Sequence, residues 1–426
     1  MQTLKKIDDS LWLIVVAILI LAVGFLFKGP SFEPSELDLI VWGILSGTMY
    51  ALTNANDKRA VDGRKAIRVE EGATIDEKAI YPNEIDYMAI GGIFAVVLTW
   101  GSLVILYSFF GPKANYPFGN ITSDLITAFG LKFPVASLPG VSQLAVALNY
   151  TIPPIFGDGI PYAFVLTGLF TILLTLSTFK IFQSAGLDYY ARWLACQMVA
   201  SLLGGHFLFN EKIPLVVAII IGVLIVFFIL TSIWKPKSIQ KTGNPRAWGV
   251  VFLISAFFRD LFVRGALLGF DNPRKIFTSF CFRAEYFSVF LLIPLGILFF
   301  RTVSNTHNQA RKTDNKPTVE TKPFKKISLP FATAFILVLV FTLQTPVVAN
   351  SLSLGPLSLQ IGNILAVSFV GLFYKTEGTR PSLAGRFTET FFRNESGFKK
   401  YYYLISYFLF LLTAIYWIYY SFTNKV

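Results

Sequence analysis

Charged side chains inside long apolar segments are the residues of this sequence best suited to binding chemistry. Two neighbouring apolar segments hold five of them: Arg259, Asp260, Arg264, Arg283 and Glu285. A charge at the centre of a membrane helix costs about 2.5 to 3.5 kcal/mol on insertion scales, so these residues are functional candidates. Arginine stays protonated and presents a fork of N–H groups that fits a carboxylate or a phosphate. The arginines outnumber the acids here, which favours a pocket for an anionic group.

The spacing of these charges limits how helices can arrange them. Arg259 and Asp260 are adjacent, about 100° apart around a helix, so both cannot face one cavity squarely. Pairing between helices would satisfy the charges, for example Asp260 with Arg283. Arg264 and Glu285 would form the second such pair. Two interpretations therefore stay open: ion pairs that fix the register of the helices, or a binding site for an anionic substrate.

Polar side chains on other apolar segments would complete such a pocket. Gln197 and Asn363 are the stronger candidates, because they occupy equivalent positions in the internal repeat described below. Lys58 would add a cation from one edge, although a lysine at the end of a span commonly extends to the membrane interface. Further candidates for the pocket wall are Tyr50, Asn54, Trp193, Tyr286, Gln344 and Gln360. Singly, each polar residue of this type also suits a helix–helix hydrogen bond.

His206 and Glu211 flank the break between two apolar segments. They are five residues apart, which does not place both side chains on one face of a helix. Histidine titrates near neutral pH, so proton coupling is one hypothesis. The favoured interpretation is a satisfied hydrogen bond of His206. Glu211 and its repeat counterpart Glu377 are predicted to hold turns between neighbouring helices.

The composition places all these residues in an integral membrane protein. The chain has 426 residues, of which 54% are hydrophobic and 15% are charged, whereas soluble domains average about 25% charged residues. Its unbroken apolar runs have the length of membrane-spanning helices, about 20 residues. The predicted fold class is all-α, a polytopic membrane helix bundle. The predicted spans are 11–27, 38–54, 87–110, 160–182, 189–209, 214–234, 247–268, 278–300, 327–349, 356–374 and 401–422.

The loops between these spans differ in charge. One alternating set of loops holds 27 lysines and arginines and the other holds 7. The positive-inside rule assigns the first set to the cytoplasm, which predicts a multi-pass protein of the cell (inner) membrane with a cytoplasmic N-terminus. The same bias explains the net charge of +12, so no nucleic-acid partner is expected. The expected partners are the lipid bilayer and a small-molecule substrate.

An internal repeat divides the chain into three parts. Residues 1–37 form an extra N-terminal helix, residues 38–234 a first five-helix repeat, and residues 235–426 a second. The alignment of these repeats pairs Trp42-Gly43 with Trp248-Gly249, Lys58 with Arg264, and Gln197 with Asn363. Because each repeat has an odd number of spans, the second must be inverted relative to the first. Inverted repeats are typical of secondary transporters, which bind substrate near the membrane midplane.

The first repeat resembles a known family. Its motifs are Ser184-Ala185-Gly186, Phe209-Asn210-Glu211-Lys212 and Gly222, and a looser copy runs from Gln344-Thr345-Pro346 through Gly355-Pro356 to Lys375-Thr376-Glu377. This pattern is similar to the EamA-like repeat of the drug/metabolite transporter (DMT) superfamily. The resemblance implies two five-helix repeats around a central pocket, alternating access, and export or exchange of small metabolites. The family usually has ten spans, so the first helix here is extra. The charge bias makes this core begin outside, whereas the family's core begins inside, so either the extra helix reverses the core or one predicted span is wrong.

The predicted function is a secondary transmembrane transporter of a small anionic or zwitterionic metabolite. The alternative is a flippase or carrier for a phosphate-bearing lipid-linked headgroup. An intramembrane enzyme is disfavoured, because the sequence has no HExxH, GxSxG or Walker motif. No cofactor and no metal site are predicted, since Cys196 and Cys281 both stand within apolar helices. The oligomeric state stays open.

Overall fold

The computed structural model describes most of the predicted apolar segments as α-helices. It covers residues 9–27, 36–69, 84–110, 151–152, 160–184, 187–209, 244–267, 290–301 and 327–350, with residues 211, 219, 287, 412 and 416. The helices with defined bounds are α1 (Asp9–Phe27), α2 (Glu36–Val69), α4 (Glu84–Phe110), α7 (Tyr162–Ser184), α8 (Leu187–Phe209), α10 (Pro245–Leu267) and α12 (Ser328–Asn350). Residues 290–301 are also helical. Two short antiparallel strands, β1 (Thr151–Ile152) and β2 (Ile160–Pro161), precede α7.

The predicted helical fold class is confirmed for the described residues. Three segments are long and apolar enough to cross a membrane: Glu84–Ser102 in α4, Leu166–Ser184 in α7 and Ser328–Val348 in α12. A helix of 19 residues is about 28 Å long, close to the hydrocarbon thickness of a bilayer. These helices indicate a membrane protein. The predicted spans 214–234, 356–374 and 401–422 lie almost entirely outside the described residues.

Helix α2 is longer than the sequence analysis predicted. The apolar run ends near residue 54, but the helix continues to Val69 and has 34 residues in all. Its last part is polar, and it is rich in alanine, lysine and arginine, which favour a helix without apolar burial. Asp57 and Lys58 follow the predicted span 38–54, but they belong to the same continuous helix.

The start of α10 shows how local sequence fixes a helix boundary. Pro245 is the first helical residue, where its missing N–H removes no intrahelical bond. Asn244 caps this end, since its Oδ1 accepts hydrogen bonds from the N–H groups of Arg246 at 3.2 Å and Ala247 at 3.3 Å. Such a cap satisfies donors that the helix itself leaves open.

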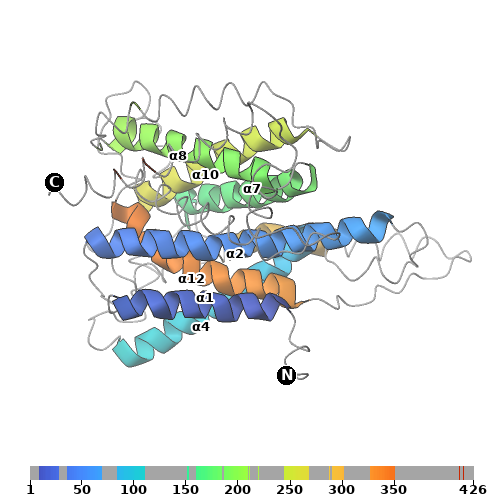
Figure 1. The fold of residues 1–426 in the computed structure, drawn as a ribbon, viewed down its shortest axis with the longest axis horizontal. Helices are drawn as coiled ribbons and strands as arrows, with labels where there is room; N and C mark the ends of the chain where they lie inside the picture. Colours follow the sequence, from blue (N-terminus) through green and yellow to red (C-terminus); the bar gives the residue numbers. More distant parts are fainter. Residues whose placement is uncertain are drawn as a thin grey trace, which may run out of the picture.

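The described helices form two groups (Figure 1). In the first group, α10 lies along α7, and α8 contacts both of them. In the second group, α12 lies along α2, and α4 and α1 contact this pair. Contacts of α10 with α12 and of α2 with α7 join the groups. The boundary between the groups is thus made by helices from distant parts of the chain.

The crossing of α8 and α10 depends on a glycine. A Cβ atom added to Gly249 would lie 1.8 Å from Cε2 of Trp193. Trp193 belongs to a buried aromatic cluster in which Tyr190 packs edge-on against Phe182 and Phe252, at centroid distances of 5.0 and 5.2 Å. Trp193, a predicted candidate for the pocket wall, lies in this cluster and not in the wall of the cavity described below. Its ring fills the space that the glycine leaves open.

Candidate functional site

A cavity of 80 Å³ lies at the boundary between the two helix groups. A water needs about 10 to 15 Å³ on this measure, so the cavity has room for several waters or for a small solute. Helices α2, α4 and α12 of one group and α7 and α10 of the other contribute to its wall. The polar residues of the wall are Tyr50, Thr53, Asn54, Asp57, Tyr87, Thr171, Thr175, Thr178, Arg259 and Thr333.

Helix α2 presents a polar stripe to this cavity. Tyr50, Thr53, Asn54 and Asp57 all line it, and their spacing of three, four and seven residues places them on one helix face. Tyr50 and Asn54 stand where the sequence analysis predicted pocket residues. Asp57 was missed, because it follows the end of the predicted span. The spacing from Tyr50 to Asp57 was the signal in the sequence that could have found it.

Asp57 is a half-buried carboxylate held by hydroxyl groups. Its Oδ1 accepts hydrogen bonds from the hydroxyl of Tyr87 at 2.8 Å and from Thr333 Oγ1 at 2.9 Å. These donors come from α4 and α12, so the carboxylate joins three helices. No basic side chain among the described residues lies within ion-pair distance of Asp57. Its negative charge is therefore balanced by hydrogen bonds alone in this part of the chain.

Asn56 orients the hydroxyl of Thr333. Its Nδ2 donates to the main-chain carbonyl oxygen of Leu329 at 2.8 Å and to Thr333 Oγ1 at 3.0 Å. The carbonyl can only accept, so the amide orientation of this fully buried residue is fixed. Thr333 Oγ1 accepts from Asn56, and its own hydrogen is directed to Asp57. Among the described residues Asn56 Oδ1 has no hydrogen-bond partner, and an unsatisfied buried acceptor costs about 1 to 3 kcal/mol.

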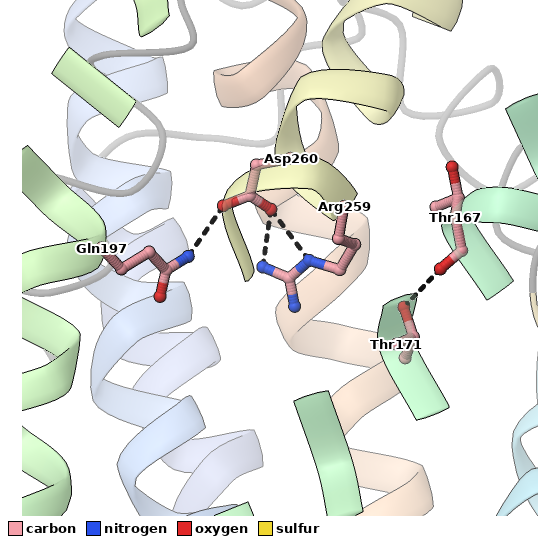
Figure 2. Close-up of polar contacts among 5 residues, drawn as sticks. All are labelled: Thr167, Thr171, Gln197, Arg259 and Asp260. Atoms are coloured by element: carbon pink, nitrogen blue, oxygen red, sulfur yellow. Dashed lines mark hydrogen bonds and ion pairs between the residues drawn. The ribbon is translucent and has the colours of Figure 1, made fainter. Parts of the chain in front are cut away.

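Arg259 is a cationic residue of the cavity wall, and it forms an ion pair with Asp260. Its Nε and Nη2 donate to Asp260 Oδ1 at 2.9 and 2.6 Å, and Gln197 Nε2 donates to Asp260 Oδ2 at 2.8 Å (Figure 2). All three side chains are buried. The guanidinium Cζ also lies 5.9 Å from the ring centroid of Phe341, within the range of a cation–π contact.

This geometry refines the predicted arrangement of the charges. Adjacent residues on a helix diverge by about 100°, yet the long arginine side chain reaches around to its neighbour. Of the pair, Arg259 lines the cavity and Asp260 does not. The predicted partner Arg283 lies outside the described residues, together with Glu285 and Asn363.

The other predicted binding residues lie away from the cavity wall. Arg264 Nε is 3.9 Å from Glu211 Oε1, and its Cζ is 5.6 Å from the ring centroid of Phe209. Lys58 is half-buried next to Asp57 on α2. Gln197 lies behind the wall, where it holds Asp260. Of the predicted charged residues that the structure describes, Arg259 is thus the one that lines the cavity.

His206 makes the hydrogen bond that the sequence analysis favoured. Its Nδ1 lies 3.0 Å from the main-chain oxygen of Glu211, and because a carbonyl oxygen only accepts, Nδ1 carries the hydrogen. The Glu211 N–H in turn donates to the carbonyl of Gly205 at 3.0 Å. The histidine is exposed at the end of α8. It closes the helix end instead of lining the cavity.

The threonines of the wall present hydrogen-bond acceptors. Thr53 donates its hydroxyl hydrogen to the carbonyl of Tyr50 at 2.7 Å. On α7, Thr171 donates to the Thr167 carbonyl at 2.9 Å (Figure 2), and Thr175 donates to the Thr171 carbonyl at 2.8 Å. A hydroxyl that donates to its own helix keeps lone pairs for a ligand. This part of the wall therefore suits a ligand rich in N–H or O–H groups.

No group of three or more metal-ligating side chains occurs among the described residues. No family model matches the sequence, and no curated protein matches it. The resemblance to the EamA-like repeat therefore stays a prediction from the residues quoted above.

Proposed function

We propose that this protein is a secondary transporter that moves a small anionic or zwitterionic metabolite across the cell (inner) membrane by alternating access. The observation that carries the proposal is the cavity between two groups of helices, a mostly apolar space with charged and polar side chains in its wall. Both an acid, Asp57, and a base, Arg259, line that cavity. Isolated charges are expensive in a membrane bundle, and they commonly mark a substrate or ion pathway.

The contacts between helices support the predicted repeats. In that scheme α2 and α10 are the first helices of the two repeats, and α7 and α12 are the third helices. Helix α2 lies along α12, and α10 lies along α7, so each first helix packs against the third helix of the other repeat. A reciprocal exchange of this kind is expected of two related repeats whose interface holds the substrate site. Rocking of one group against the other would open the cavity to alternate sides.

Arg259 is the residue proposed to face the anionic group of the solute. Asp260 and Gln197 fix the orientation of its guanidinium from behind the wall. A planar guanidinium held in this way recognises a carboxylate or a phosphate more strictly than a lysine ammonium would.

Counterflow in liposomes tests this proposal. The full-length protein is purified and reconstituted, and exchange of radiolabelled small carboxylates and zwitterions is measured. An Arg259→Gln, Asp260→Asn double variant removes both charges of the pair and leaves no unpaired one. We expect it to lose at least about tenfold in exchange rate, because a charge-assisted contact to the solute disappears.

The matched control is Arg264→Gln, which removes an arginine of the same helix that does not line the cavity. Its exchange rate is expected to stay within about twofold of the unmodified protein. Thermal unfolding in detergent verifies that each variant is folded. Full exchange activity in a folded double variant, or no exchange of any solute in the panel, would overturn the proposal.

A further inference from the structure

The two charged residues of the cavity wall differ in how they are balanced. Arg259 has a carboxylate partner at 2.6 Å. The partners of Asp57 among the described residues are the hydroxyls of Tyr87 and Thr333. Among the charged side chains that the structure describes in the cavity wall and directly behind it, Arg259 and Asp260 balance each other, and Asp57 adds a negative charge. A carboxylate removed from water without a cation is costly, so a positively charged ligand is favoured there.

We propose that Asp57 is the binding site for a protonated amine, and hence that the transported solute carries an ammonium group. This assignment deepens the proposed function, on which its transport aspect rests. Asp57 Oδ1 accepts both hydroxyl hydrogen bonds. A carboxylate has about four lone-pair positions, so it retains accepting capacity for an N–H group.

The surrounding wall matches the three donors of an ammonium. Thr53 stands one turn before Asp57 on α2, and Thr175 faces the same cavity from α7. Both hydroxyls donate to their own helices, so toward the cavity they act as acceptors. An ammonium group has three N–H donors and no acceptor. The combination of one carboxylate and several acceptor oxygens is therefore complementary to it.

The same geometry favours a protonated amine over a proton as the occupant. A proton would neutralise Asp57 but would leave the acceptor threonines of the wall without a donor. A protonated amine uses both features.

Ligand-induced stabilisation of the full-length protein in nanodiscs tests this site, with methylammonium chloride as the probe. A ligand of two heavy atoms binds at best with a dissociation constant of a few millimolar, so concentrations on the order of 10–100 mM are required. Methylammonium should raise the melting temperature more than equal sodium chloride does, because it binds the folded state. In Asp57→Asn, the methylammonium concentration that gives the same rise in melting temperature should be at least about tenfold higher. Asp57→Glu should respond to methylammonium at a concentration between those of Asp57→Asn and the unmodified protein.

Asp86→Asn is the matched control, because Asp86 is a carboxylate of α4 that pairs with Arg301 at 3.5 Å and does not line the cavity. It should respond to methylammonium as the unmodified protein does. Three results would overturn the assignment. These are no stabilisation by methylammonium beyond that of sodium, a full response in Asp57→Asn, or stabilisation by acid alone with none by the amine.

Failure of this site and failure of the proposed function give different results. If methylammonium does not bind but Arg259-dependent exchange of carboxylates persists, only the amine assignment is wrong. If methylammonium binds through Asp57 but no solute is exchanged, the site is correct and the transport proposal is wrong.

Discussion

The cavity wall has two charged regions, and their charges are balanced in different ways. On α10, Arg259 is neutralised by the next residue in the chain, and Gln197 from α8 completes the hydrogen bonds of Asp260. On α2, the described partners of Asp57 are hydroxyl groups, which come from α4 and α12. The first region is complete in itself. The second leaves a charge that a ligand can balance.

This difference separates a charge that a neighbouring side chain balances from one that no described side chain balances. Breaking a buried ion pair leaves an uncompensated charge, which destabilises a protein strongly. Neutralising a carboxylate that has no cationic partner removes a desolvation cost instead. The same chemical change, a carboxylate to an amide, should therefore have opposite consequences in the two regions.

The largest expected effect is that of Asp260→Asn. It leaves the buried Arg259 without its carboxylate, so we expect the free energy of unfolding to fall by about 3 to 5 kcal/mol. Asp57→Asn should leave the stability unchanged or raise it, because it removes a charge that no described basic side chain balances. Denaturant unfolding of both variants in mixed micelles measures the difference. Equal losses of stability in the two variants would contradict the contrast drawn here.

A smaller effect is expected for Thr333→Val. The hydroxyl of Thr333 accepts from Asn56 and donates to Asp57, so its removal should cost about 1 to 3 kcal/mol. Thr48→Val is the control, because the Thr48 hydroxyl donates only within its own helix, to the Ile44 carbonyl at 2.9 Å.

The control variant should change the free energy of unfolding by no more than about 0.5 kcal/mol. The same unfolding assay compares the two. If both threonines prove equally replaceable, the hydroxyl network around Asp57 does not contribute to stability as described.

Hydropathy predicted the positions of the helices well, because the length and apolarity of a membrane-spanning segment are properties of the local sequence. It failed at the end of α2, where the apolar run stops and the helix does not. Asp57 follows the predicted span 38–54, and it was not among the candidate residues for that reason. A search for polar residues at helical spacing beyond the apolar run would have included it.

The contacts of the charged residues were harder to predict. The prediction that Arg259 and Asp260 diverge by about 100° around the helix did not consider the length of the arginine side chain. That side chain is long enough to reach the neighbouring carboxylate. Gln197 was chosen as a pocket residue from its place in the repeat, and it stands behind Asp260 instead. Such placements depend on how α8 is set against α10, where the contact of Gly249 with Trp193 controls the approach. Spacing along one helix does not contain that information.

The central claim is that the cavity between the helix groups opens to both sides of the membrane. Cysteine accessibility tests this most directly, in a background where Cys196 and Cys281 are replaced by alanine. Thr175→Cys places a thiol in the cavity wall, and Val97→Cys, on an outward-facing position of α4 that is 62% exposed in the bundle, is the control.

A small membrane-impermeant thiosulfonate reagent is applied to sealed vesicles of either orientation. Alternating access predicts that the thiol at position 175 reacts from both sides of the membrane, and that the lipid-facing thiol at position 97 reacts from neither. Reaction at position 175 from one side only, or from neither side, would contradict the account.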